Sequence, residues 1–316
     1  TFALIAYGIG DVLGAGVYAL TGKVAGLVGP ASWMAFVVSF VVAGLTGLSY
    51  AELASRYPRA AGAAVYTLEA FRKPAVSFII GILVLCSGMV SMAVVSHSFS
   101  GYLQALFPQI PAFWVKIIFL SVLGVIVFCG IKQSSAANII CMMIEVSGLL
   151  IVIWAGMKFF GHADYFAIEP AKNIRPELAL LQGSVLAFYA FLGFEDIVNM
   201  AEETRQPEKT LPRAILISLG AVVIVYVLVA LAAVSAVGID QLASSRSPLL
   251  DVAQKGFPSM PREIFTFIAL FAVSNTALIN FVMCSRLLYG MAQEKLIPGW
   301  VGIIHRSTHT PYMAIL

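Results

Sequence analysis

Charged residues are scarce in this chain of 316 residues: 11% are Asp, Glu, Lys or Arg, and 60% are hydrophobic. A soluble domain of this size needs more charge to solvate its surface, so the composition excludes an ordinary soluble globular protein. Four stretches, 24–51, 74–115, 214–239 and 264–285, carry no charge at all. Each is longer than the roughly 20 residues that cross the hydrocarbon of a bilayer. The sequence therefore predicts an all-α membrane protein in contact with lipid.

Paired cysteines, basic patches and nucleotide motifs are also missing. Cys86, Cys129, Cys141 and Cys284 lie in apolar segments without a close thiol pair or a histidine at metal-ligand spacing, so we interpret them as packing residues and expect no metal. The net charge of +3 comes with no basic cluster, so a nucleic-acid partner is not expected. No phosphate-binding Gly-x-x-x-x-Gly-Lys-Ser/Thr loop is present, and no cofactor is expected.

The apolar runs predict eight membrane-spanning helices in a single transmembrane domain, 1–316. Residues 311–316 resemble the start of a ninth span, so we expect the sequence to be a fragment, cut after the eighth span. Eleven of the 19 Lys and Arg residues fall in connections at one end of the bundle, which is therefore predicted to be cytoplasmic. The predicted spans are 2–26, 31–55, 75–106, 112–131, 134–159, 179–203, 210–237 and 263–292.

Two glycine-rich interruptions break the first and sixth spans, at 8–16 and 191–196. Glycines weaken a helix, so the first span can unwind and leave the amides of Ala15, Gly16 and Val17 to bind a carboxylate at the start of the following half-helix. Close packing of a neighbouring helix on small residues explains the first interruption equally well. The matching interruption five spans later favours a functional role over close packing. An offset of an odd number of spans inverts the topology, which indicates an inverted repeat.

Only four charged residues lie deep in the predicted spans: Asp11, Glu145, Glu195 and Asp196. Each costs at least ~2.5 kcal/mol unless it faces protein, water or a partner, so such residues are usually functional. The alternatives are a neutral carboxyl bonded between helices for Glu145 and Glu195, and a helix N-cap for Asp196.

Polar side chains also follow one side of the eighth span. Thr276 and Asn280 lie one turn apart on one face and can line a solute site, or can bond to carbonyls of their own helix. We interpret His97 in the third span as a buried, hydrogen-bonded histidine.

Several motifs resemble the amino acid/polyamine/organocation superfamily, and specifically its amino-acid permeases of the bacterial, cationic-amino-acid-transporter-like branch. The resemblance extends over essentially the whole chain, with the motifs in the order of that family. They are Gly-Asp-Val-Leu-Gly-Ala-Gly-Val-Tyr at 10–18, Tyr-Ala-Glu-Leu at 50–53 through Arg-Tyr-Pro at 56–58, Phe-Leu-Gly-Phe-Glu at 191–195, Ala-Glu-Glu-Thr at 201–204 with Pro207, Leu-Pro-Arg-Ala-Ile at 211–215, and Ser-Arg-Leu-Leu-Tyr-Gly-Met-Ala at 285–292.

The resemblance implies a five-plus-five inverted-repeat transporter fold with about twelve helices, and it also implies roles. Backbone around Val12, Ala15, Gly16 and Val17 would hold the α-carboxylate of an amino acid. Carbonyls near Tyr189 and Leu192, beside Gly193, would hold the α-amino group. Tyr189 matches an aromatic gate, Glu195 an acid linked to proton sensing, and Asn280 a side-chain pocket position.

One departure concerns ion coupling. Some proton-driven relatives carry a lysine in the middle of the fifth span, where this chain has Glu145. That mechanism does not transfer, so a proton site, a cation site shared with Thr276 and a structural role all stay open for Glu145.

The sequence as a whole predicts a secondary transporter of L-amino acids in the cytoplasmic membrane, coupled to H⁺ or working as an exchanger, with Na⁺ less favoured. It is not expected to be an enzyme. Asp11, Glu145 and Glu195 are the candidate coupling residues. Two alternatives stay open: an amino-acid sensor without net flux, and an intramembrane aspartyl protease, because residues 8–11 spell Gly-x-Gly-Asp and Asp196 offers a second aspartate.

Overall fold

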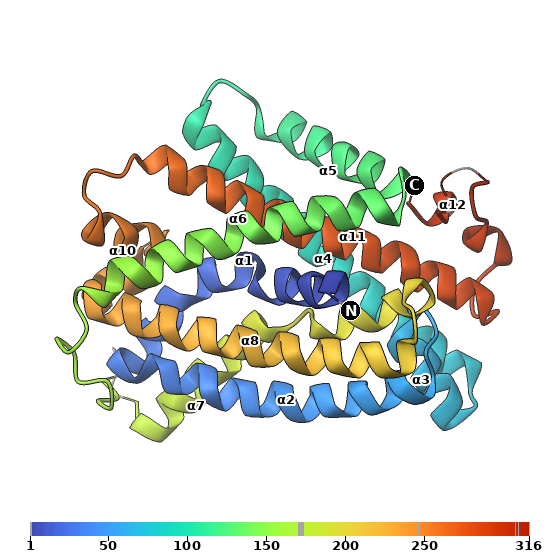
Figure 1. Cartoon of the computed structure of the whole chain (residues 1–316), viewed down its shortest axis with the longest axis horizontal. Helices are drawn as coiled ribbons and strands as arrows, with labels where there is room; N and C mark the ends of the chain where they lie inside the picture. Colours follow the sequence, from blue (N-terminus) through green and yellow to red (C-terminus); the bar gives the residue numbers. More distant parts are fainter. Residues whose placement is uncertain (1, 170–173, 246, 307, 309, 316) are drawn as a thin grey trace.

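The computed structural model describes residues 2–169, 174–245, 247–306, 308 and 310–315, without the side chains of Ala15, Ala105, Ile131 and Lys132. The described part is a bundle of helices (Figure 1), and its one β-bridge joins Ile304 to Pro311. The long helices are α1 (Phe2–Val28), α2 (Ser32–Arg56), α4 (Pro74–Leu106), α5 (Ala112–Phe128), α6 (Ile131–Met157), α8 (Pro207–Ala236) and α11 (Arg262–Gln293). The sixth predicted span is divided into α7 (Pro176–Phe188), η2 (Tyr189–Phe191) and η3 (Phe194–Glu203).

Short helices fill the connections at the two ends of the bundle. At one end lie α3 (Gly62–Phe71), η4 (Gly299–Gly302) and α12 (Tyr312–Ile315); at the other lie η1 (Gly29–Ala31), α9 (Ile239–Ser244) and α10 (Pro248–Gly256). Figure 1 shows α3 and α12 at the right-hand end and α10 at the left. We call the end with α3 and α12 the basic end, because the predicted cytoplasmic Lys and Arg residues lie in its connections.

All eight predicted spans correspond to helical segments whose limits lie within a few residues of those expected. Among the described residues, six segments are long and apolar enough to cross a membrane, and Phe2–Gly14 and Ala112–Phe128 are shorter apolar helices. Large hydrophobic side chains are exposed along α4 and α5 at the periphery of the bundle, as lipid contact requires. The chain is therefore described as an integral membrane protein.

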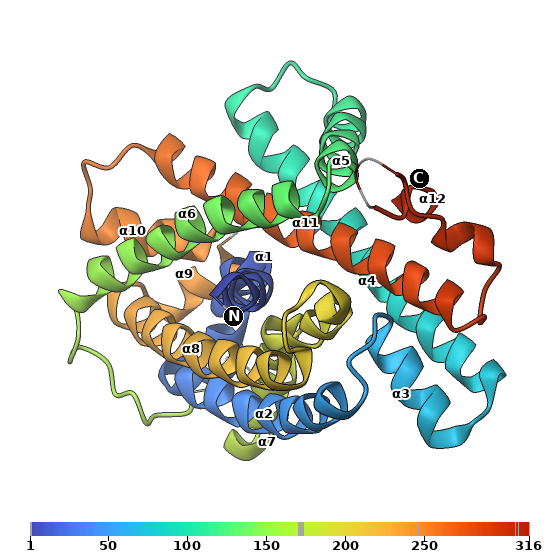
Figure 2. The same ribbon diagram turned by 45° about the vertical axis from the view of Figure 1, so that its right-hand side comes forward.

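Helix α1 lies at the centre of the bundle. It packs against α6, α7, α8, α9 and α11, and Figure 2 shows it nearly end-on between α6, α8 and α11. Around it, α2 packs along α8, and α11 packs along α4. Since α1 is surrounded by protein, a conformational break within it is shielded from lipid.

Both interrupted spans are broken in the structure. Gly14 has non-helical backbone angles (φ −7°, ψ −163°), which divide α1 into two halves. In the sixth span, Leu192 is extended and Gly193 has φ +122°, a conformation that favours glycine. The first interruption is narrower than expected, because the helix is regular up to Gly14, and the segment after the second is a ten-residue 3₁₀ helix rather than an α-helix.

Candidate functional site at the two helix breaks

The two breaks lie against each other in the middle of the bundle. A Cβ atom on Gly16 would lie 3.3 Å from the Cα atom of Ala190, and one on Gly193 would lie 2.8 Å from the Cγ atom of Asp11. A Cβ atom on Gly193 would clash with Asp11, and one on Gly16 would require Ala190 to shift by a few tenths of an ångström. The glycines therefore bring the backbone of α1 next to the backbone of η2 and the loop that follows it.

Tyr226 joins the two breaks from α8. Its side chain is fully buried, and its hydroxyl lies within hydrogen-bonding distance of the carbonyl oxygens of Val12 and of Ala190, the latter at 2.7 Å. A hydroxyl has one proton, so it donates to one of these carbonyls at a time. Tyr226 therefore stabilises whichever broken helix accepts its proton, and the other carbonyl remains available to another donor.

Two asparagines support the end of the first half of α1. The Asn275 amide donates to the carbonyl oxygen of Gly10 at 3.1 Å, and the Asn138 amide donates to Asn275 Oδ1 at 2.9 Å. These bonds satisfy a carbonyl that lies four residues before the break. They also connect α1 to α6 and α11.

A cavity of about 540 Å³ adjoins the breaks, within the range of small-ligand sites. It is bounded by α1, α2, α4, η2, η3 and α11, and its α4 wall is built of valines and small residues between 84 and 98. Nine of the twelve residues predicted to bind substrate or ions line it: Asp11, Val12, Gly16, Tyr189, Leu192, Gly193, Glu195, Thr276 and Asn280.

The other three predicted residues do not line the cavity. Val17 is completely buried, which leaves only its backbone for a ligand. The side chain of Ala15 lies outside the described residues. Glu145 is also completely buried, away from the cavity wall, and the amide of Asn275, which donates to Gly10, is the polar group that approaches its carboxyl oxygens.

Polar groups of α11 line the cavity while bonding to their own helix. Thr276 Oγ1 donates to the Ala272 carbonyl at 3.3 Å, and the Asn280 amide donates to the Thr276 carbonyl at 2.8 Å. Thr276 and Asn280 therefore line the cavity and also bond to carbonyls of their own helix, so the two alternatives for these residues are compatible.

Two further residues predicted from the sequence are exposed. Tyr189 is 62% exposed at the rim of the cavity. His97 is also exposed, so the interpretation of His97 as a buried histidine is wrong.

Three carboxyl groups lie at the break of the sixth span. Glu195 Oε2 accepts the backbone N–H of Gly193 at 2.9 Å. Asp196 makes no capping bond at the start of η3, so the alternative of a plain N-cap is wrong. Its side chain instead lies within hydrogen-bonding reach of Asp11, and both aspartates are buried.

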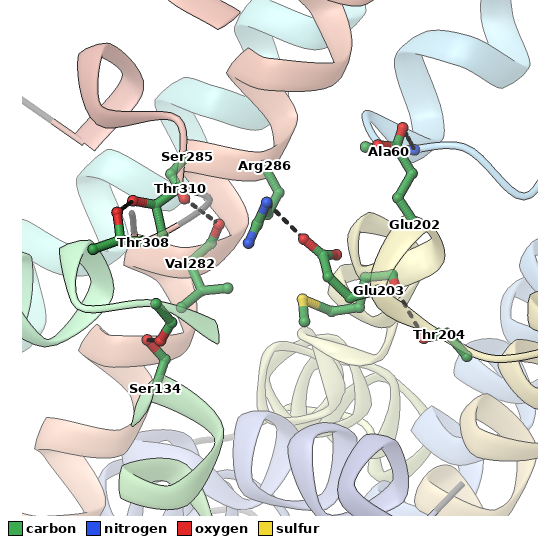
Figure 3. A network of polar contacts seen from close by, with 12 residues as sticks. Ala60, Ser134, Glu202, Glu203, Thr204, Val282, Ser285, Arg286, Thr308 and Thr310 are labelled. Carbon is green, nitrogen blue, oxygen red and sulfur yellow. Dashed lines mark hydrogen bonds and ion pairs between the residues drawn. The ribbon is translucent and has the colours of Figure 1, made fainter. Parts of the chain in front are cut away.

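Ion pairs connect the elements at the basic end (Figure 3). Arg286 of α11 and Glu203 of η3 form a largely buried pair with an Nη1–Oε1 distance of 2.6 Å. Beside it, Glu202 accepts the backbone N–H of Ala60 at 3.3 Å. At the same end, Arg59 donates to Glu294 at 3.1 Å. These contacts tie η3, α11 and the connection before α3 together at one end of the cavity.

A second cavity, of about 360 Å³, lies toward the opposite end of the bundle. Tyr18 of α1, Tyr102 of α4 and the pair Arg262 and Glu263 of α11 are among its lining residues. Helices α1, α4 and α11 contribute to both cavities, but none of the site residues predicted from the sequence lines this second one.

Sequence reasoning missed several residues that shape this site. Tyr226 is the one aromatic residue in the apolar run of α8, and that isolation is a signal. Asn138 and Asn275 are amides within apolar helices, where an unpaired polar group is costly. The proximity of Asp11 to Asp196 has no local signal, because 184 residues separate them in the chain.

Known proteins share both the sequence pattern and the fold. The family model for amino acid permeases matches residues 1–316. The branched-chain amino acid permease BcaP of Bacillus subtilis is 27% identical over 99% of the chain and 70% of the relative, and cationic amino acid transporter 4 of Mus musculus is 29% identical over 100% of the chain and 53% of the relative. The chain thus spans between about half and about two thirds of these proteins.

The fold is that of a known transporter. Mhp1, a nucleobase-cation-symport-1 family transporter solved in a closed conformation with bromovinylhydantoin bound, superposes with a TM-score of 0.60 at 12% identity, over 99% of this chain and 68% of Mhp1. This identity supports the fold alone. The matching family model, which covers every residue, decides the family: the chain belongs to the amino acid permeases of the amino acid/polyamine/organocation superfamily.

Proposed function

We propose that the protein is a secondary active transporter that moves L-amino acids across the cytoplasmic membrane by alternating access, coupled to protons or working as an exchanger. The observation that carries this proposal is the meeting of two broken spans beside one cavity in the middle of the bundle. In lipid, a break is tolerated where its backbone groups face protein, water or a ligand. An amino acid supplies a carboxylate and an ammonium group to such a pair of helix ends.

The carboxylate of the substrate would bind at the start of the second half of α1. The backbone there, at Ala15, Gly16 and Val17, follows the break at Gly14, and the first amides of a helix lack carbonyl partners in the preceding turn. Val12, on the other side of the break, would complete this part of the site. The absence of a side chain on Gly16 leaves room for the ligand.

The ammonium group would bind to carbonyls of the sixth span at Tyr189, Leu192 and Gly193. Thr276 and Asn280 would face the substrate's side chain, together with the valines of α4. Tyr189, exposed at the rim, would close the cavity over the bound substrate. Asp11, Glu145 and Glu195 are the candidate coupling residues.

Matching breaks in the first and sixth spans support a five-plus-five inverted repeat. The break at Gly14 and the break at Gly193 both occur in spans that cross at the centre of the bundle. Rocking of the helices around the fixed cavity would then expose it to each side in turn. The ion pairs of the basic end would hold one of these exits closed.

Transport is tested in proteoliposomes containing the full-length protein. We expect uptake of labelled L-amino acid to be competed by a panel of amino acids, and accumulation to follow an imposed pH gradient more strongly than a sodium gradient. Counterflow without any gradient would identify an exchanger. Tight binding with neither uptake nor counterflow would contradict transport and identify a sensor.

The protease alternative requires separate consideration, because Asp11 and Asp196 do lie together. Its geometric condition is thus met, but relatives over the whole chain are named permeases and transporters, which points to a role other than catalysis. Cleavage of a membrane peptide that is abolished by Asp11→Asn, in a protein without solute flux, would contradict the proposal.

A further inference from the structure

The carboxyl groups of Asp11 and Asp196 form a pair that links the two broken spans. Asp11 comes from the first half of α1 and Asp196 from the start of η3, and each side chain is within hydrogen-bonding reach of the other. They are 5% and 6% exposed. Two carboxylates both only accept hydrogen bonds, so a bond between these groups requires a proton on one of them.

An unsatisfied atom supports the same conclusion independently. Oδ2 of Asp11 is buried and has no hydrogen-bond donor among the described residues. A buried acceptor without a donor is unusual in a folded protein and calls for a ligand or a proton. A proton held between the Asp11 and Asp196 carboxyl groups would supply a donor at this place.

Among the described residues, no Lys, Arg or His forms an ion pair with Asp11 or Asp196. The ionisable groups that act electrostatically on the pair, or on which it acts, are acids, phenols and a thiol: Tyr7 on α1, Tyr50 on α2, Glu145 on α6, Glu195 on η3, Tyr226 on α8 and Cys284 on α11. A doubly ionised pair would therefore hold two negative charges inside the bundle without a counter-ion. Binding one proton removes one of them.

The described residues contain no cluster of three or more His, Cys, Asp or Glu side chains arranged to hold a metal ion. Glu195, which adjoins the pair in sequence, already accepts the N–H of Gly193 and so has a donor without taking up a proton. The pair thus differs from Glu195, the family position at which proton sensing was expected.

We propose that Asp11 and Asp196 share one proton, and that this shared proton is the ion coupled to amino-acid transport. The proposal rests on the transport function proposed above and narrows the coupling site to one pair. When the first half of α1 and η3 lie together, one carboxylic acid donates to the other carboxylate. When they separate, the O–H bond breaks, the proton passes to water, and two carboxylates remain.

The test uses the full-length protein in proteoliposomes, with Asp11→Asn and Asp196→Asn as variants and Asp240→Asn as the matched control. Asp240 is an exposed aspartate on α9, so its replacement makes the same chemical change away from the cavity. For each protein, counterflow, accumulation driven by a pH gradient, and proton movement followed with a pH-sensitive dye are measured. We expect both pair variants to keep counterflow and to lose gradient-driven accumulation and proton movement, while Asp240→Asn matches the wild type.

The outcomes separate this proposal from the transport function itself. Wild-type accumulation and proton movement in Asp196→Asn would overturn the shared proton, as would accumulation that follows a sodium gradient without proton movement. Absence of both counterflow and accumulation in the wild type would overturn transport. In that case, or if a variant fails to fold, infrared spectroscopy of purified Glu145→Gln decides, since it lacks the other completely buried carboxyl group: a protonated-carboxyl band that titrates away as the pH rises supports the pair, and its absence at every pH overturns it.

Discussion

Several carboxyl groups at the basic end of the bundle form ion pairs, whereas the aspartates of the central cavity form none with a described residue. Glu203 pairs with Arg286, and Glu294 pairs with Arg59. Asp11 and Asp196, which line the cavity, and Glu145, which is buried away from it, form no ion pair with a described residue. An ion pair within the protein compensates both charges and holds two elements together, while an unpaired carboxyl group in a membrane requires a proton, water or a ligand. The ion pairs therefore fix the conformation of the basic end, whereas the central cavity is where we propose that a ligand binds.

Gly16→Leu is expected to have the largest effect, because it fills the space in which α1 approaches Ala190 and the substrate. Amino-acid affinity should fall at least about a hundredfold, roughly 2.7 kcal/mol, in a protein that remains folded. The measurement is binding of labelled amino acid to the purified protein. Gly44→Leu is the control, since a Cβ atom on Gly44 meets nothing within 4 Å; equal affinity in both variants would remove the carboxylate site from α1.

Arg286→Gln tests the paired region. It leaves Glu203 without its partner in a largely buried position, and loss of one member of a buried pair costs roughly 3 kcal/mol. We expect a lower melting temperature in detergent and a basic end that opens more readily to water-soluble thiol reagents. The matched control is Arg56→Gln, whose pair with Glu52 is two-thirds exposed and contributes at most about 0.5 kcal/mol. Similar destabilisation by both variants would contradict the comparison.

Tyr226→Phe removes the hydroxyl that serves both broken helices. One buried carbonyl, of Val12 or of Ala190, then loses its donor, at a cost of about 1–3 kcal/mol. The expected result is reduced thermal stability that added amino acid partly restores, because the ammonium group of the substrate replaces the missing donor. A loss of stability that the amino acid does not restore would assign Tyr226 a purely structural role.

Glu145→Gln is expected to have the smallest effect on stability, under about 1 kcal/mol, since Gln keeps an oxygen that can accept from the neighbouring Asn275 amide. Its effect on transport distinguishes the alternatives for this residue. Loss of concentrative uptake with normal melting would identify a coupling role for Glu145 in addition to the aspartate pair. Unchanged uptake would make Glu145 structural, and a large drop in melting temperature would show that the carboxyl group has a partner that an amide cannot replace.

The long helices could be predicted from sequence because uncharged runs above the bilayer thickness leave little choice of structure. The breaks at Gly14 and Gly193 were predicted from clustered glycines, although the extent of the first was overestimated. Helix α3 was missed, since its ten residues are too short for a membrane span and too apolar for an ordinary loop. Tyr66 in α3 shows that burial extends beyond the spans: desolvation raises the pKa of its hydroxyl well above the usual value.

The site itself is harder to predict than the helices that carry it. Each half of the site has a local signal, such as the glycines around Gly16 or the acids at Glu195, but their contact depends on packing across the bundle. Asp196 illustrates the limit: its position beside Gly193 resembles an N-cap, and only the approach of Asp11 gives it another partner. Roles for the backbone at Val12, Ala15 and Val17 remain predictions from the family resemblance.

The most direct test of the account is a structure of the full-length protein with the best amino acid of the competition panel bound. The account predicts the substrate's carboxylate beside the backbone of residues 15–17 and its ammonium group beside the carbonyls of the sixth-span break. An amino acid bound only in the cavity near Arg262 and Glu263, with the two breaks closed against each other, would contradict it.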